Sequence, residues 1–289
     1  MESETKMIKR LLLTCIVILA VLGLVACAAP GAMPGSKRVA ATTVASEKLE
    51  QLISISETEW RRWGSRIVEL QPGDKFCMRM PDGSCERVDD GCGQEQTSAL
   101  CPVVNEYWRL VPRRDDRHGC TRTDICEFRS PASGSPGLQQ TPPWSAAFVS
   151  AMMQRAGFSD TEFRASPSHA GYVVAARDGE TSSYDVIPTP ASAQAGDLIC
   201  APRSNAVITP DTLGRIVAGS NATPLHCDIV VRVGSDFTLE AIGGNVQQSV
   251  SKTLVKLDSK GRVSAQINPN RKWALVMRAR ADVTVQAAR

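Results

Sequence analysis

The chain has 289 residues and a formal net charge of +3, with basic and acidic residues nearly in balance. Such a balance excludes the strong positive field on which nucleic-acid binding depends, and no basic stripe with interleaved aromatic residues occurs. We therefore expect no nucleic-acid partner. The length allows one large domain with a substantial core.

The first 26 residues have the features of a lipoprotein signal peptide. Basic residues precede an apolar run over residues 11–25, which is too short to span a bilayer comfortably and ends in Leu-Val-Ala before Cys27. We expect residues 1–26 to be removed and Cys27 to carry lipid chains that anchor the protein in a membrane. An uncleaved anchor helix is the alternative. The residue after Cys27 is Ala28 and not an aspartate, which in Gram-negative sorting favours the outer membrane. The predicted location is therefore periplasmic and lipid-anchored.

Composition divides the remainder of the chain. Residues 27–46 are rich in Ala, Gly, Pro, Ser and Thr and predict a flexible tether. We expect a single domain over residues 47–280 and a tail over residues 281–289. The domain begins with a helix-like recurrence of apolar residues over 47–70, which predicts one or two helices. A cysteine-rich insertion over residues 76–136 follows, interrupted by a short predicted helix over 103–111.

Ten cysteines are present, and eight remain after Cys15 leaves with the signal and Cys27 takes lipid. Export places the eight in an oxidising compartment, so we expect disulfides. Six lie in the insertion with no Cys-x-x-Cys pair and only His118 nearby, so no metal site is expected, and their connectivity is open. The six are Cys77, Cys85, Cys92, Cys101, Cys120 and Cys126. Cys200 and Cys227 are predicted to bridge neighbouring strands, with free buried thiols as the alternative.

The second half, a core predicted over residues 142–280, begins with helices and continues as strands. Two prolines at its entry and a glycine at its exit predict a helix over 144–156, and a second helix is expected from Ser166 or Ser168 to Ala176. Six β-branched runs separated by turn residues then predict an antiparallel sheet. These runs are 197–201, 227–233, 237–242, 250–257, 263–267 and 273–278. Helices followed by strands indicate an α+β fold.

A constellation with catalytic character spans these elements. Ser145 falls in the first turn of the predicted helix, where the positive helix end and unpaired N–H groups favour a developing negative charge. His226 begins a predicted strand and is the candidate general base, while Asn245, after the next strand, is the candidate that orients its ring. Asp228 is the rival orienter, but its spacing of two residues from His226 predicts that the two side chains lie alongside each other.

Several segments together resemble the bacterial family called domain of unknown function 2272. They are Pro143–Phe148, Ser168–Tyr172, Gly196–Arg203, His226–Val231 and Ile242–Val246. That family is in turn similar to the CHAP and NlpC-type amidases. The resemblance implies a papain-like (CHAP/NlpC-like) fold with N-terminal helices packed on an antiparallel sheet, elaborated here by the disulfide-rich insertion. It also implies that Ser145 takes the place of a catalytic cysteine, with His226 as base and Asn245 as orienter, and that the substrate is peptidoglycan or a muropeptide.

Three further residues are candidates for substrate contact: Trp144, His169 and Asp228. His169 is open to a structural reading, as a histidine bonded to backbone, and Ser145 to readings as a binding-site remnant or a helix-start residue. The main functional hypothesis is a cell-envelope lipoprotein that hydrolyses an amide bond in peptidoglycan without a cofactor. The alternative is a non-catalytic lipoprotein that holds a wall peptide or a partner protein in a degenerate groove. Esterase or acyl-transfer chemistry on lipids is a third possibility for the same residues.

Overall fold

The computed structural model describes residues 46–71, 75–79, 82–86, 94–96, 99–112, 143–203, 208–219, 221–268 and 271–280, all within one compact unit. The predicted signal peptide, the predicted lipidation site at Cys27, almost all of the predicted tether, the tail and most of the cysteine-rich insertion lie outside the described residues. Among the described helices, none has the length and apolar character of a membrane span.

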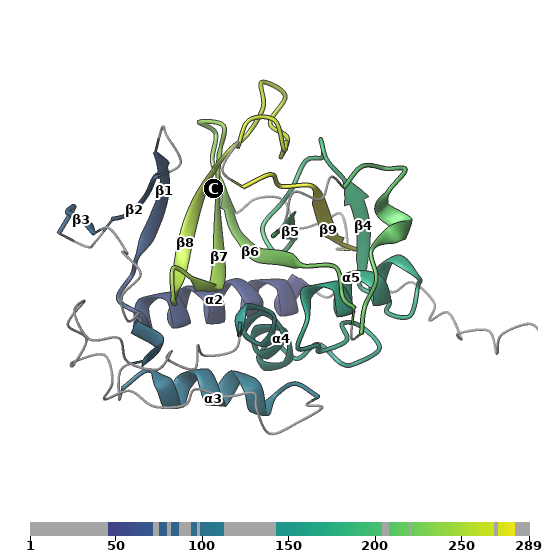
Figure 1. Cartoon of the computed structure of the whole chain (residues 1–289), viewed down its shortest axis with the longest axis horizontal. Helices are drawn as coiled ribbons and strands as arrows, with labels where there is room; N and C mark the ends of the chain where they lie inside the picture. The colour runs from purple at the N-terminus through teal and green to yellow at the C-terminus, as the bar shows by residue number, and fades with distance from the viewer. Residues whose placement is uncertain are drawn as a thin grey trace, which may run out of the picture. The chain divides into compact units, whose positions relative to one another are not determined.

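The described residues form a mixed α+β structure in which helices precede most of the strands (Figure 1). The α-helices are α2 (Ser46–Arg62), α3 (Cys101–Arg109), α4 (Ser145–Arg155) and α5 (His169–Arg177), and the short 3-10 helices are η2 (Gln94–Gln96) and η4 (Leu213–Arg215). The strands are β1 (Ile67–Gln71), β2 (Lys75–Arg79), β3 (Cys85–Glu86), β4 (Tyr184–Pro188), β5 (Leu198–Pro202), β6 (Leu225–Val233), β7 (Thr238–Val246), β8 (Ser249–Lys256) and β9 (Leu275–Ala279).

The strands form one sheet in the order β3-β2-β1-β8-β7-β6-β5-β9-β4. Every pair is antiparallel except β1 and β8, which run parallel. The central hairpins follow from the sequence, because their β-branched runs are separated by short turns. The sequence predicts an antiparallel sheet, and the structure has a mostly antiparallel one, since β1 and β8 form a parallel pair that the sequence did not indicate.

Both faces of the sheet are covered by apolar side chains. On one face α4 packs against β6 and β7, and α2 and α3 pack around α4, with Trp63 and Tyr107 stacked on Trp144. On the other face Val230, Ala241 and Val276 form a second cluster that is closed by Trp273 and Val263. Because side chains alternate along a strand, Cys227 and Ile229 belong to the first cluster while Val230 belongs to the second.

Helix α4 approaches the sheet closely because β7 carries a glycine at the contact. A Cβ atom on Gly244 would lie 2.4 Å from the Cβ of Phe148 and 2.9 Å from the ring of Trp144, so any larger residue would push the helix away. The neighbouring Gly243 faces the opposite side of the strand, where a Cβ atom would lie 1.8 Å from Oδ1 of Asp228. Gly244 therefore allows α4 to pack close to β7, and Gly243 allows the carboxylate of Asp228 to lie close to the same strand.

The predicted disulfide between Cys200 and Cys227 is present. The two residues are direct partners in the register of β5 and β6, with Cα atoms 4.1 Å apart, the spacing of a close antiparallel pair. Cys101, at the start of α3, is also disulfide-bonded. The pairing of the insertion as a whole lies outside the described residues.

Two predicted elements differ from the structure, and several strands were not predicted. The recurrence over residues 47–70 contains a single helix, α2, followed by a strand, β1, because Ile67 and Val68 pair with β2 and β8. Strands β2, β3 and β4 were not predicted. The run over 263–267 is no strand: only Val263 pairs, in an isolated bridge with Ala191, and its side chain closes the second cluster.

Candidate functional site

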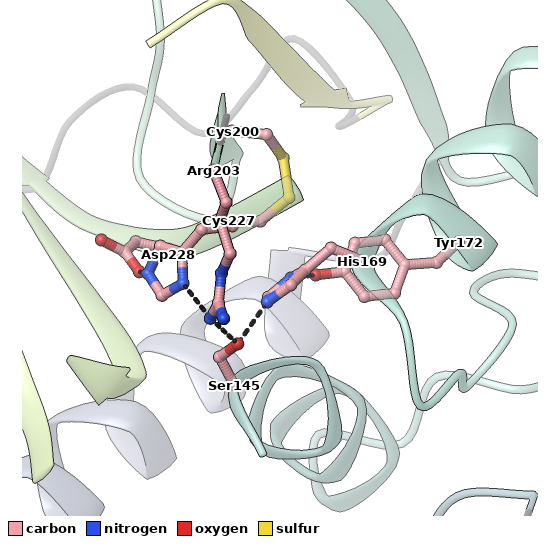
Figure 2. Close-up of a disulfide and its surroundings, with 8 residues drawn as sticks. Ser145, His169, Tyr172, Cys200, Arg203, Cys227 and Asp228 are labelled. Atoms are coloured by element: carbon pink, nitrogen blue, oxygen red, sulfur yellow. Dashed lines mark hydrogen bonds and ion pairs between the residues drawn. A yellow bond between two sulfur atoms is a disulfide. The ribbon is translucent and has the colours of Figure 1, made fainter. Parts of the chain in front are cut away.

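Four segments meet at the end of the sheet where β5 stops and β6 begins (Figure 2). Ser145 is the first residue of α4, and His169 is the first residue of α5. Arg203 directly follows β5, and His226 is the second residue of β6, in register with Ala201. The site is thus assembled from two helix starts and two strand ends, which are places where backbone geometry fixes a side chain well.

Ser145 and His169 are in direct contact. Oγ of Ser145 lies 2.6 Å from Nε2 of His169, and Nδ1 of the same ring is hydrogen-bonded to the hydroxyl of Tyr172. Tyr172 stands three residues after His169 on α5, a spacing that brings side chains together on one helix face. The result is a continuous Ser145–His169–Tyr172 chain of polar atoms, which runs from the lower centre of Figure 2 to its right side.

Arg203 reaches down between the two histidines. Its Nη2 donates to Oγ of Ser145 at 2.8 Å and to Nδ1 of His226 at 3.2 Å. A guanidinium group has only donors, so Nδ1 of His226 must be the acceptor and its Nε2 must carry the proton. That Nε2 lies 2.7 Å from Oδ1 of Asp228, which accepts it. His226 is therefore a neutral ring with a fixed tautomer.

Asp228 is held from three sides. It is completely buried, and its second oxygen accepts from Nη1 of Arg271 at 3.3 Å. The absence of a side chain on Gly243 leaves room for its carboxylate. Burial alone raises the pKa of a carboxyl group, but the hydrogen bond from His226 and the positive charges of Arg271 and Arg203 hold the pKa of Asp228 below its usual value. The carboxylate is therefore ionised at neutral pH.

Burial makes both imidazoles reluctant to take a proton. Ser145 is 2% exposed, and His169 and His226 are each 4% exposed. Burial is the main cause that lowers the pKa of His169 well below its ordinary value, and the positive charges of Arg203 and Arg271 add to it. Burial also lowers the pKa of His226, although the carboxylate of Asp228 opposes that shift. Burial raises the pKa of Tyr172 well above its usual range, so its phenol stays protonated.

The histidine that contacts Ser145 is not the one that the sequence predicts. No hydrogen bond joins Ser145 to His226, although both residues are described; Arg203 lies between them. The rings of His169 and His226 are neighbours, with centroids 5.3 Å apart. The cause is geometric, since the starts of α4 and α5 converge while His226 turns toward Asp228. The sequence also predicts that Asp228 lies alongside His226 without contacting the tip of its ring. That prediction is wrong, because the imidazole folds back so that its Nε2 bonds to the carboxylate.

Asn245 does not reach the ring of His226. Within the described structure the ring nitrogens of His226 are bonded to Arg203 and Asp228, and no hydrogen bond joins Asn245 to either. Asn245 instead has a backbone φ of 54°, in the left-handed region, at the irregularity in the β7–β8 register. Asparagine tolerates that conformation better than most residues, which accounts for its presence.

Trp144 is a core residue where the sequence predicts a substrate contact. It has no exposed surface, its indole N–H donates to Glu95, and its ring stacks on Trp63. Of the other two residues predicted to touch substrate, His169 is in the site but bonded to Ser145, and Asp228 lies behind His226.

Sequence reasoning gave no role to Tyr172, Arg203 or Arg271. The spacing of Tyr172 from His169 on a predicted helix is a signal that could have found it. Arg203 ends a segment that matched the family pattern, but nothing in the sequence places a strand-end arginine over a helix start. Arg271 comes from the loop before β9 and meets Asp228 only through the fold. No group of three or more potential metal ligands gathers among the residues that the structure describes.

These features define an α+β protein with a buried serine–histidine contact at the end of its sheet, crossed by an arginine. The chain belongs to the DUF2272 family, an uncharacterized protein family conserved in bacteria, which matches residues 95–279. No curated protein and no solved structure matches the chain.

Proposed function

We propose that the protein is a serine hydrolase of the cell envelope that cleaves an amide bond in peptidoglycan, with Ser145 as nucleophile and His169 as general base. One observation carries the proposal. A hydroxyl at the start of a helix lies 2.6 Å from an imidazole nitrogen whose opposite nitrogen is held by a third group. Nucleophile, base and orienting group in this relation are the arrangement that activates a serine.

The proton route follows from the hydrogen bonds. When Nδ1 of His169 donates its proton to the hydroxyl of Tyr172, Nε2 is free to accept the proton of Ser145. Oγ then attacks the carbonyl carbon, and the imidazolium returns the proton to the departing amine. Water releases the acyl group from Ser145 in the second half of the reaction by the same route in reverse.

Positive groups surround the oxygen that becomes charged. Nη2 of Arg203 already donates to Oγ at 2.8 Å, and the first-turn N–H groups of α4 have no partner within the helix. Both stabilise negative charge that develops at Ser145 and at the substrate carbonyl. His226 and Asp228 position Arg203, since Nδ1 of His226 accepts from the guanidinium and Asp228 fixes the His226 tautomer.

The substrate assignment is supported by the resemblance to cell-wall amidases and by the predicted lipoprotein leader with Cys27 as its lipidation site. A papain-like fold agrees with the order of the elements, in which the nucleophile helix α4 precedes the strand that bears His226 and both pack together. On this proposal the protein works at the periplasmic face of the outer membrane with peptidoglycan as its partner.

The test combines turnover with active-site labelling. Full-length protein in detergent is incubated with purified peptidoglycan, and the appearance of new amino termini is measured beside labelling by a fluorophosphonate probe. We expect Ser145→Ala to abolish both signals and His169→Ala to reduce turnover about 100-fold or more. His226→Ala should reduce turnover less than His169→Ala. Turnover that persists in Ser145→Ala would refute the assignment of the nucleophile.

The pH dependence of the hydrolytic activity provides a second test of the same proposal. The base form of His169 is the active one, and its pKa lies well below the ordinary histidine value of 6.5. Activity should therefore persist as the pH falls below 6.5 and decline only at lower pH. Arg271→Gln removes one of the charges that lower this pKa and should move the acidic limb upward. An acidic limb above pH 6.5 in the wild type would contradict the assignment of His169.

A second candidate function is supported by Arg203. Its guanidinium already occupies the approach to Ser145, and the serine and both histidines are almost completely buried. This closed arrangement agrees with a non-catalytic lipoprotein that binds a wall peptide or partner protein when Arg203 moves aside. Muropeptide binding without fluorophosphonate labelling and without turnover would favour this candidate.

A further inference from the structure

Among the residues that the structure describes, Arg203 carries a positive charge that no carboxylate pairs with. His226 connects Arg203 to one carboxylate, that of Asp228. The two oxygens of Asp228 are already bonded to His226 and Arg271. In the part of the chain that the structure describes, no Asp or Glu oxygen lies within ion-pair distance of Arg203, whose side chain bonds only to Ser145 and His226. Two guanidinium groups therefore share one carboxylate, and the site carries an uncompensated positive charge beside the serine.

This excess charge is poorly tolerated without an anion. Burial of its head group and the charge of Arg271 lower the pKa of Arg203, which means that the protonated guanidinium is destabilised where it lies. Its two acceptors, a hydroxyl and a neutral imidazole, do not offset the charge as a carboxylate would. An anionic group entering the site would therefore be bound at the guanidinium in preference to a neutral group.

The position of Arg203 specifies where on a substrate such an anion must be. Nη2 already lies 2.8 Å from Oγ of Ser145, while the residue as a whole is exposed to solvent. Within the described ranges, the other N–H groups of the guanidinium have no hydrogen-bond partner, so they can form the paired bonds that a planar carboxylate accepts. A carboxylate bound there lies next to the carbonyl that Ser145 attacks.

We propose that Arg203 recognises the terminal carboxylate of the substrate and that the enzyme removes the last residue of a peptide. In a C-terminal residue only the α-carbon separates the carboxylate from the scissile nitrogen, which matches the proximity of Arg203 to Ser145. The inference rests on the proposed hydrolysis. Oγ of Ser145 bonds to the carbonyl carbon, the C–N bond breaks, and the free amino acid leaves with the proton that His169 took from the serine. Water then hydrolyses the acyl–serine ester.

The test uses one stem-type peptide of peptidoglycan that ends in D-Ala, synthesised as the free acid and as the primary amide. Full-length protein in detergent is incubated with each peptide, and release of the last residue is measured by mass spectrometry. We expect kcat/KM for the acid to exceed that for the amide by about tenfold or more, the effect of a charge-assisted pair. Arg203→Ala should abolish this preference, and Arg203→Lys should restore only part of it. Arg215→Ala, which removes an exposed arginine outside the site, should leave the preference unchanged.

A binding measurement separates the failure of this inference from the failure of the proposed hydrolysis. Calorimetry on Ser145→Ala should show about tenfold tighter binding of the acid than of the amide, and adding Arg203→Ala should remove the difference. If neither peptide is cleaved but the acid still binds preferentially through Arg203, the hydrolase proposal fails and the carboxylate recognition stands. If acid and amide are cleaved or bound equally, or if Arg203→Ala weakens both alike, the carboxylate recognition is overturned.

Discussion

At the scale of single residues, the site shows how two side chains of one type acquire different tasks. His169 and His226 have ring centroids 5.3 Å apart, yet one contacts Ser145 and the other is fixed between Arg203 and Asp228. Residue type and order along the chain identified Ser145 and both histidines as candidates. They did not determine which imidazole meets the serine, because that depends on how the starts of α4 and α5 converge in three dimensions.

Asn245 and Asp228 provide a test of this arrangement at the residue scale. If Asn245 is present for its left-handed backbone, Asn245→Gly should change the free energy of unfolding by about 0.5 kcal/mol or less, since glycine adopts that conformation freely. Asn245→Ala should lower it by about 1 kcal/mol. Asp228→Ala should lower it by about 3 kcal/mol, because Arg271 loses its buried partner and His226 its acceptor.

Urea unfolding of the three variants and the wild type measures these differences. Fluorophosphonate labelling of the same proteins shows whether the site survives, and Asn245→Gly should label as well as the wild type. If Asn245→Gly loses labelling while its stability is unchanged, the carboxamide itself serves the site, and the backbone explanation of Asn245 is incorrect.

At the scale of elements, the sequence predicted those helices and strands whose pattern was unambiguous. Helices α4 and α5 and strands β5 to β9 fall close to their expected ranges, because prolines, glycines and β-branched runs mark their ends. Strand β1 was missed because a short apolar run fits helical and strand periodicity alike, and only its partners β2 and β8 decide between them. The strand predicted at 263–267 is absent, because the apolar Val263 packs in the second cluster on the sheet and does not belong to a strand.

A buried carboxylate directly before β5 forms hydrogen bonds to residues of β9. Asp197 is completely buried, and it accepts from the backbone N–H of Ala279 at 2.9 Å and of Gln194 at 2.9 Å, and from Nε of Arg278 at 3.1 Å. Burial raises the pKa of Asp197 to about 6, although these hydrogen bonds and the charge of Arg278 oppose the shift. This carboxylate should therefore make the attachment of β5 sensitive to pH.

The sign of that sensitivity follows from proton uptake. The folded state holds a proton on Asp197 up to about pH 6, whereas the unfolded chain releases it near its ordinary value of 3.8. Folded protein thus binds more protons between these values, so the contribution of Asp197 to stability falls as the pH rises from about 4 to about 6. The stability difference between the wild type and Asp197→Asn should shrink over this range in urea unfolding. Asp185→Asn, which removes an exposed carboxylate on β4, is the matched control, and an equal slope in both comparisons would contradict the prediction.

At the scale of the whole molecule, the folded unit extends beyond the segment that defines its family. The family match begins at residue 95, but α2, from Ser46 to Arg62, belongs to the same core. Leu52 and Trp63 are completely buried, and Trp63 stacks on Trp144, the residue directly before Ser145. Glu59 of α2 accepts from Arg155 at the end of α4 at 2.6 Å. The position of Ser145 therefore depends on residues outside the family segment.

Deletion of residues 46–66 should consequently prevent stable folding of the remainder. Each large apolar side chain that this segment buries contributes about 1.5–3 kcal/mol, and a whole domain is stable by only about 5–15 kcal/mol. The loss of Leu49 and Leu52 from α2 and of Trp63 after it therefore removes most of that margin. The deletion also removes the residues directly before β1, which pairs in parallel with β8. Near-ultraviolet circular dichroism and urea unfolding compare the deletion with the full chain, and we expect no cooperative transition in the deletion. A cooperative transition at the wild-type midpoint would mean that α2 only covers a core that is already stable, and that the seating of α4 is fixed by the sheet alone.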